Sequence, residues 1–312
     1  MSFLLALVRL VRLPNLLIAL LSQAIPYWWV LRPALLRAGG IPALEEYHFA
    51  CIAGATLLTM LGGYIINDYF DINIDEVNKP NKMVVDKVIN RRWAIAWHFM
   101  LSTSGIILTV LALPFLQKWY LILANVFCVA LLWFYSTNFK KSLLTGNIVI
   151  SLLTAWTILI IFFSKVDLAD AFGAGSTNQA KFFKLAVLYA GFAFIISLVR
   201  EAIKDMEDMP GDSKYGCRTM PIVWGVNATK VYAAVWLIVL IAVLVILQVY
   251  VLQFKWWLAI AYSVPAIIFP LVVILFKLRK SVTTEDFHKL SNMTKLVMFT
   301  GILSMVFFYY YL

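Results

Sequence analysis

Asn67-Asp68-Tyr69-Phe70-Asp71-Ile72-Asn73-Ile74-Asp75 follows an apolar run, Phe49 to Ile66, that is long enough to cross a bilayer. Its carboxylates at 68, 71 and 75 are spaced i, i+3 and i+7, so on a helix they share one face. Like charges this close repel one another unless a cation lies among them. Since no His or Cys accompanies them, a hard divalent ion with oxygen ligands is expected, Mg²⁺ first. Taken alone, the stretch is also compatible with a solvated acidic helix end.

A second stretch repeats the pattern. Lys204-Asp205-Met206-Glu207-Asp208-Met209-Pro210-Gly211-Asp212 also ends a membrane-length apolar run, and its aspartates at 205, 208 and 212 have the spacing of the first set. Two matched acidic clusters, each following a long apolar segment, favour one shared site over two unrelated solvated ends. Because proline and glycine interrupt helices, Pro210 and Gly211 predict that Asp212 reaches this site from a turn.

Composition places the chain in a membrane. Of its 312 residues, 63% are apolar and 13% charged, whereas soluble domains carry about 45–50% and about 25%. The fold expected is all-α: one polytopic domain over residues 1–312. The net charge of +10 comes from basic residues that flank apolar spans, so membrane topology and anionic lipid explain it better than nucleic acid. The three cysteines show no pairing or metal-binding spacing.

Nine spans of roughly 20 residues are predicted. They cover about 14–32, 49–67, 93–114, 117–135, 143–164, 182–203, 229–253, 256–276 and 293–312. With a cytoplasmic N-terminus, most of the 26 lysines and arginines lie on the cytoplasmic side, together with both acidic clusters, as the positive-inside rule requires. Residues 2–13 are expected to form an interfacial helix, not a cleavable signal, and a prokaryotic plasma membrane is the simplest location.

The acidic clusters and the cations around them indicate a diphosphate site. A diphosphate cannot lie directly against carboxylates, but Mg²⁺ bridges the two and stabilises the charge of a diphosphate leaving group. Basic residues near the clusters are candidates to bind its outer oxygens; they are Lys82, Arg91, Lys204, Lys214 and Arg218. Because the site borders the bilayer, the substrate is expected to carry an apolar tail among the helices, where aromatic faces can stabilise a carbocation.

The two motifs, Asn67-Asp68-x-x-Asp71-x-x-x-Asp75 and Asp208-x-x-x-Asp212, resemble the aspartate motifs of the UbiA superfamily of intramembrane prenyltransferases. Their placement after spans two and six and the opening segment Arg12-Leu13-Pro14-Asn15 are similar too, so the resemblance covers nearly the whole chain. It implies a helical bundle with a lateral opening to lipid and a cytoplasmic polar cap over the active site. It also implies Mg²⁺-dependent transfer of a prenyl group from its diphosphate to an acceptor.

The resemblance also implies residue roles. Asn67, Asp68, Asp71, Asp208 and Asp212 would hold Mg²⁺ and diphosphate, with Asp75 and Asp205 in support, so Asp71, Asp208, Asp75 and Asp205 are the expected catalytic residues. Asn15 would contact substrate. The family's Tyr-x-x-x-Lys element has only a near match here, Tyr135 and Lys140, with one extra residue between them. The loop 78–87 lacks the glycine that relatives usually carry.

The acceptor is suggested by the second motif region. The run Arg200-Glu201-x-x-Lys204-Asp205 and the later Gly216-x-x-Thr219-Met220-Pro221-Ile222 look most like the branch that alkylates geranylgeranylglyceryl phosphate for ether lipids. A related signature occurs in homogentisate prenyltransferases, so the alternative is an aromatic acceptor of the 4-hydroxybenzoate or homogentisate type. Ionisation of the allylic C–O bond would precede attack by the acceptor, whose proton Asp75 or Asp205 could take.

Three other functions compete. An EF-hand at Asp71-x-Asn73-x-Asp75 fails because Glu76 replaces the required glycine and Lys82 the required glutamate. A cation transporter would place ionisable residues deep in its spans, whereas the predicted spans lack them at their middles. A membrane terpene cyclase would use the same metal site without an acceptor. The expected partners are therefore a prenyl diphosphate, a lipophilic or aromatic acceptor and the bilayer; no nucleic acid or obligatory protein partner is expected.

Overall fold

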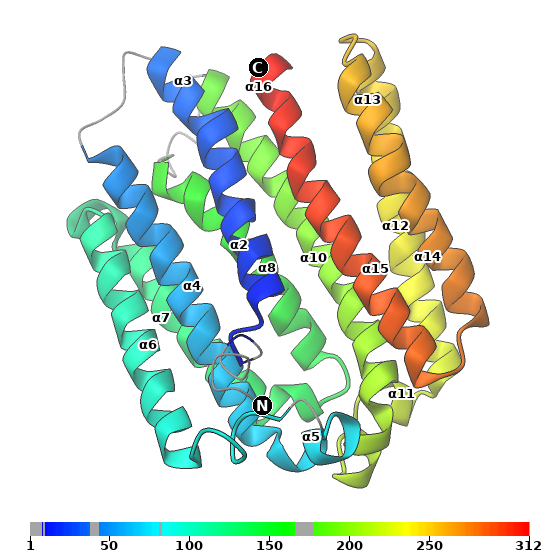
Figure 1. Ribbon diagram of the computed structural model, residues 1–312. Coiled ribbons are helices and arrows are strands. Elements are labelled where there is room, and N and C mark those ends of the chain that lie inside the picture. Colours follow the sequence, from blue (N-terminus) through cyan, green and yellow to red (C-terminus); the bar gives the residue numbers. More distant parts are fainter. Residues whose placement is uncertain (1–7, 9, 38–43, 81–82, 166–176, 312) are drawn as a thin grey trace.

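The computed structural model describes residues 8, 10–37, 44–80, 83–165 and 177–311. These residues are mostly helical, with one isolated bridge between Val85 and Ile89 and no strand among them. The α-helices form one bundle (Figure 1). They are α2 (Leu13–Ile25), α3 (Arg32–Arg37), α4 (Glu45–Phe70), α5 (Ile72–Asn78), α6 (Arg91–Ala112), α7 (Phe115–Thr137), α8 (Thr145–Lys165), α10 (Thr177–Lys214), α11 (Met220–Val223), α12 (Val226–Leu252), α13 (Trp257–Ser263), α14 (Phe269–Lys280), α15 (Thr284–Leu303) and α16 (Phe308–Tyr311).

The predicted membrane spans are confirmed. In the described part of the chain, 9 helical stretches are long and apolar enough to cross a bilayer, from Leu13–Leu36 to Thr284–Tyr311. Two of them carry proline at a π-helical turn, Pro26–Leu31 and Val264–Ile268. Such a turn accommodates the carbonyl that proline leaves without its helical donor. The first described helix starts at the end of the bundle where α5 lies, and α16 ends at the opposite end (Figure 1).

Small residues let the first helices pack closely. A Cβ added at Gly105 of α6 would lie 2.9 Å from Thr59 Oγ1 of α4, and one at Gly62 would lie 2.9 Å from Ser102 Oγ. Nearby, His98 Nδ1 lies 2.9 Å from the Gly62 carbonyl oxygen. Because lipid tails are as apolar as leucine, membrane helices associate through such close van der Waals packing and not through the hydrophobic effect.

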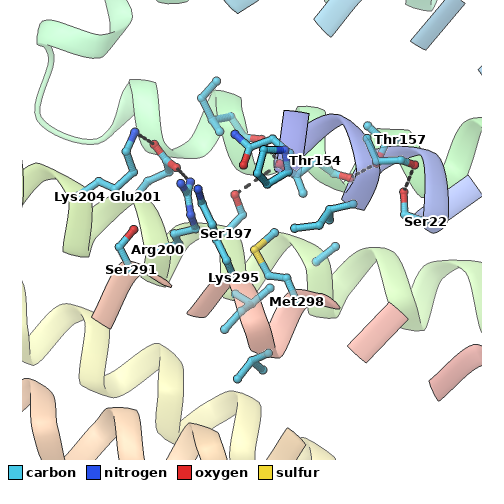
Figure 2. Close-up of a pocket in the computed structure, with 18 of the residues that line it drawn as sticks. Ser22, Thr154, Thr157, Ser197, Arg200, Glu201, Lys204, Ser291, Lys295 and Met298 are labelled. Carbon is cyan, nitrogen blue, oxygen red and sulfur yellow. Dashed lines mark hydrogen bonds and ion pairs between the residues drawn. The ribbon is translucent and has the colours of Figure 1, made fainter. Parts of the chain in front are cut away.

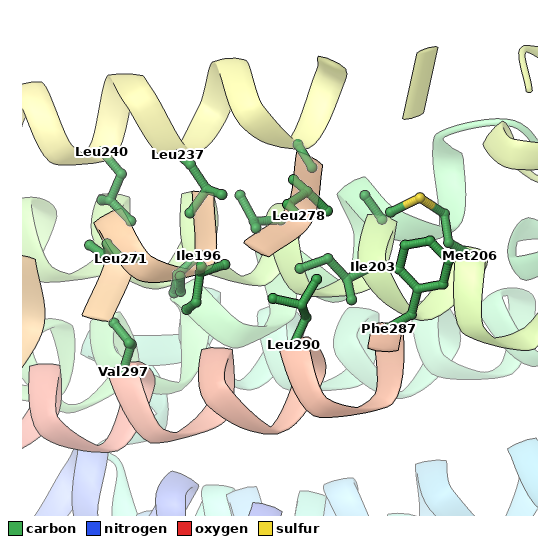
Figure 3. Close-up of a cluster of buried hydrophobic side chains, with 14 of the residues drawn as sticks. Ile196, Ile203, Met206, Leu237, Leu240, Leu271, Leu278, Phe287, Leu290 and Val297 are labelled. Carbon is green, nitrogen blue, oxygen red and sulfur yellow. The ribbon is translucent and has the colours of Figure 1, made fainter. Parts of the chain in front are cut away.

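The second half of the bundle has its own apolar core, built where α10, α12, α14 and α15 meet (Figure 3). Ile203, Leu237, Leu271 and Ile274 are fully buried there. This packing fixes α10 against α15, the two helices that carry the charged groups described below.

Two helices differ from the sequence-based prediction. The predicted break at Pro210 and Gly211 is wrong, because α10 continues through both residues to Lys214. The last span also begins earlier than residue 293: α15 starts at Thr284, where Thr283 and Asp286 form a capping box. Lys295 consequently lies about three turns inside the helix and not at its start. The predicted interfacial helix over 2–13 falls mostly outside the described residues.

Candidate functional site

A cavity of about 850 Å³ occupies the bundle between its two halves. At one end it is lined by polar residues of α4, α5 and α10, including both aspartate motifs. Away from that end its wall is largely apolar, with Leu240, Leu244, Ile267 and Leu271 contributed by α12 and the helices after it. Figure 2 shows part of the lining, with α10 above and α15 below. The two motifs therefore share one cavity, as their matched spacing predicts.

Each motif is neutralised by cations from other segments. Arg12 Nη2 lies 2.5 Å from Asp68 Oδ1, and Lys79 Nζ lies 2.7 Å from Asp208 Oδ1. Burial opposes the charge on Lys79, but the ion pair with Asp208 outweighs it and raises the pKa of Lys79. Because Lys79 belongs to the segment after the first motif and Asp208 to the second, this pair joins the motifs directly.

Asp71 has the most enclosed partner. Lys140, in the turn after α7, forms an ion pair with Asp71, and their side chains are 9% and 15% exposed. Asn67, one turn earlier on α4, donates from Nδ2 to Asp71 Oδ2 over 2.7 Å. Lys140 therefore reaches the first motif even though one extra residue separates it from Tyr135 compared with the family's Tyr-x-x-x-Lys element.

Asn78 connects the motifs a second time. Its Nδ2 donates to the Asp208 carbonyl over 2.8 Å, and its Oδ1 accepts from the Gly211 backbone N–H over 2.8 Å. Proline removes a donor and disturbs the preceding turn of a helix. Both contacts flank Pro210, so the Asn78 side chain ties α5 to the turn of α10 that contains the proline, and α10 continues through that turn.

The supporting aspartates differ in environment. Asp205 Oδ2 accepts from Asn147 Nδ2 of α8 over 2.8 Å. Asp75, on α5, has no ion pair within the described residues. Burial, with the negative charge of Asp71 next, raises the pKa of Asp75 to about 6. Asp212 lines the cavity from the last turn of α10.

The donor set suits Mg²⁺. Within the described residues no three His, Cys, Asp or Glu side chains are grouped closely enough to form an all-protein metal site. Mg²⁺ does not need such a cage, since it is usually held by one or two carboxylates, water and substrate phosphate oxygens. Asn67 Oδ1 is a buried acceptor that has no hydrogen-bond partner in the described structure, beside Asp71. The oxygens at the two motifs therefore fit a hard cation.

Most of the predicted site residues line the cavity. They are Asn15, Asn67, Asp68, Asp71, Asp75, Tyr135, Lys140, Lys204, Asp205, Asp208 and Asp212. Three predicted phosphate-binding cations lie outside it: Arg91 pairs with Asp86, while Lys214 and Arg218 are exposed. These three follow or flank the motifs in sequence, but their helix or turn directs them away from the cavity. Lys82 falls outside the described residues.

Sequence reasoning assigned no individual role to several lining residues. Arg12 and Arg200 stand only within longer segments of the family resemblance, and Lys79 only within the loop 78–87. The sequence does contain a signal for Lys79: it lies four residues after Asp75, so on a helix it shares the face of α5 that carries this aspartate. Lys295 had none, since its significance depends on where α15 begins.

The cavity and its two motifs can be compared with known proteins. The sequence pattern of the UbiA prenyltransferase family matches residues 23–307. The digeranylgeranylglyceryl phosphate synthase of Methanospirillum hungatei is 30% identical over 276 residues, which is 86% of this chain and 88% of the relative.

Two solved structures share the fold. A UbiA homologue from Aeropyrum pernix has a TM-score of 0.64 at 14% identity, covering 92% of this chain and 96% of its own. A homologue from Archaeoglobus fulgidus, bound to DMAPP and Mg²⁺, has a TM-score of 0.56 at 16% identity, covering 95% and 98%. At these identities the structures establish the helical arrangement, while the family match rests on sequence. The chain belongs to the UbiA prenyltransferase family and is an integral, multi-pass membrane protein.

Proposed function

We propose that this prenyltransferase moves a geranylgeranyl group from its diphosphate to geranylgeranylglyceryl phosphate, with Mg²⁺ as cofactor. The observation that carries the proposal is that both aspartate motifs, held together by the Asn78 and Lys79 contacts to Asp208, line one end of a cavity whose remaining wall is largely apolar. An amphiphilic diphosphate matches both parts of that cavity. The acceptor is supported by the name of the Methanospirillum relative, which is a digeranylgeranylglyceryl phosphate synthase.

The cofactor's ligands would come from both motifs. Asn67, Asp68, Asp71, Asp208 and Asp212 would hold Mg²⁺, which when bound neutralises the charge that builds up on the departing diphosphate. Lys140 and Lys79, now paired with Asp71 and Asp208, lie where each ammonium group can also donate to phosphate oxygens.

The apolar part of the cavity would hold the prenyl chain and keep water from the allylic carbon. Tyr135 lines the cavity in the same region as Lys140, and an aromatic face there can stabilise positive charge on an ionising allylic group. Asp75 and Asp205 are the carboxylates expected to support the motifs, and either can accept the proton of an attacking hydroxyl.

The site is proposed to face the cytoplasm. Most basic residues lie at the ends and loops that share the bundle end of the aspartate motifs, and the positive-inside rule assigns that side to the cytoplasm. The α5 segment lies across this end of the bundle (Figure 1), where it would form part of a polar cap.

The test is a paired assay of purified protein with Mg²⁺ and geranylgeranyl diphosphate. One sample receives geranylgeranylglyceryl phosphate and the other 4-hydroxybenzoate. Product in the first sample alone is expected. Product in the second sample alone would show that the acceptor is aromatic and not the lipid phosphate. Consumption of the diphosphate without either product would favour a cyclase.

A further inference from the structure

A second charged cluster lies deeper in the cavity than the aspartate motifs. Arg200, Glu201 and Lys204 follow one another along α10, and Lys295 rises toward them from α15 (Figure 2). Arg200 Nη1 lies 2.6 Å from Glu201 Oε1, and Lys204 Nζ lies 3.8 Å from Glu201 Oε2. All four residues line the cavity. Ser291, one turn before Lys295 on α15, is buried and lines it too.

The cluster has more positive than negative charge. Glu201 is shared by Arg200 and Lys204, while no acidic side chain of the described residues lies within ion-pair distance of Lys295. The neighbouring carboxylate of Asp205 accepts from Asn147 of α8, and even when it is counted the three cations outnumber the carboxylates. The Arg200 side chain is 15% exposed, and its Nε atom is buried without a hydrogen-bond partner in the described structure. Burying uncompensated charge is costly, so such a group is typical of a site that receives an anion.

The contrast with the aspartate motifs is informative. There, Arg12, Lys79 and Lys140 each have an aspartate of their own. Arg200 precedes Asp208 by eight residues, a rise of about 12 Å along a helix. Arg200 therefore lies about two helical turns from Asp208, and with Lys295 lacking an acidic partner among the described residues, this part of the cavity can accept an anion other than a diphosphate held at Asp208.

We infer that Arg200, Lys204 and Lys295 form a separate binding site for the phosphate monoester of the acceptor. This inference rests on the proposed function, which supplies an acceptor with one phosphate group. A phosphate monoester carries between about 1.5 and 2 negative charges at neutral pH, opposite in sign to the excess charge of the cluster. A guanidinium next to an ammonium provides both the bidentate and the point-charge donors that phosphate accepts.

The position suits the reaction. In the acceptor the phosphate and the free hydroxyl share one three-carbon glycerol unit, so a phosphate held beside the donor site keeps the hydroxyl within reach of the allylic carbon. The acceptor's own apolar chain can then follow the apolar wall near Leu240, Leu244 and Leu271. Holding one reactant by its phosphate restricts its orientation, which is a substantial part of enzymatic rate enhancement.

The test compares two acceptors, geranylgeranylglyceryl phosphate and geranylgeranylglycerol, in a neutral detergent without anionic lipid. The kcat/KM ratio of the two acceptors is measured for the wild type, Lys295→Gln and Lys295→Arg, and the KM for geranylgeranyl diphosphate is measured alongside. Lys289→Gln is the matched control, because Lys289 lies on the same helix but is exposed and paired with Glu285. Lys204→Gln, at a half-buried position on α10, serves if Lys295→Gln does not fold.

The wild type is expected to favour the phosphorylated acceptor, and Lys295→Gln to reduce that preference by about tenfold or more, as loss of a charged hydrogen bond would. Lys295→Arg should restore most of it, and Lys289→Gln should leave it unchanged. The inference would be overturned if Lys295→Gln kept the wild-type preference for the phosphorylated acceptor. It would also be overturned if the variant raised the KM for geranylgeranyl diphosphate and left the acceptor preference unchanged. Either result would leave the proposed function intact. A wild type inactive with the phosphorylated acceptor would refute both.

Discussion

The side chain of Asn78 and the backbone of Gly211 form a hydrogen bond of 2.8 Å between the two aspartate motifs. The same amide donates to the Asp208 carbonyl over 2.8 Å. A Cβ at position 211 would lie 2.6 Å from Asn78 Nδ2, so glycine is required for this approach. The geometry of the carboxylates proposed to bind Mg²⁺ is thus coupled to a residue that carries no charge.

Replacing Asn78 should therefore weaken both stability and activity. Asn78→Ala removes two part-buried hydrogen bonds between α5 and α10, at a cost of about 1–3 kcal/mol in total. We expect a lower thermal midpoint and a transfer rate reduced at least several-fold. Asn73→Ala, at an exposed position on the same helix α5, is the control. Equal behaviour of the two variants would show that the Asn78 contacts do not position the motifs.

Gly211→Ala tests the same contact from the other side. The added methyl group cannot be accommodated without moving Asn78, so the Lys79–Asp208 pair should be disturbed as well. The measurement is the concentration of Mg²⁺ that gives half-maximal transfer, which should rise. Gly191→Ala is the matched control, since a Cβ at position 191 on the same helix meets nothing within 4 Å. An equal rise of the half-maximal Mg²⁺ concentration in Gly191→Ala would show that the Asn78–Gly211 contact is not the cause.

Lys140 should matter far more than its neighbour Lys141. Lys140 pairs with Asp71 in an enclosed position, whereas Lys141 is exposed. Removing one partner of a part-buried ion pair leaves an uncompensated carboxylate and also deletes a proposed phosphate donor. Lys140→Met is expected to lower kcat/KM for the diphosphate by about tenfold or more, and Lys141→Met to change it little. Comparable losses in both variants would indicate a general effect of charge at this end of the bundle.

Removal of the cofactor should abolish transfer reversibly. Because no group of three His, Cys, Asp or Glu among the described residues could hold the ion by itself, bound diphosphate is expected to supply part of the Mg²⁺ coordination. Transfer should stop in EDTA and return with added Mg²⁺, and Mg²⁺ should protect the protein against thermal unfolding more strongly when geranylgeranyl diphosphate is present. Undiminished transfer in EDTA would contradict the assigned role of the motifs.

The sequence predicts the span count and the convergence of the motifs well, because apolar run length and carboxylate spacing are local properties. It does not predict which cation neutralises which aspartate, since Arg12, Lys79 and Lys140 reach their partners only through the tertiary arrangement. Helix ends are similarly difficult. Pro210 is a strong helix-breaking signal, yet α10 continues through it. The capping box at Thr283 marks the start of α15 and so places Lys295 well inside that helix, where it lines the cavity.

The most direct measurement is transfer by Asp71→Asn, Asp208→Asn and the double variant, with saturating Mg²⁺ and geranylgeranyl diphosphate. If both motifs bind one diphosphate, each single change should remove most of the activity, and the double variant should be little worse than either, because residues that act as a unit are not additive. Full transfer by either single variant, in protein shown to be folded, would contradict a shared site.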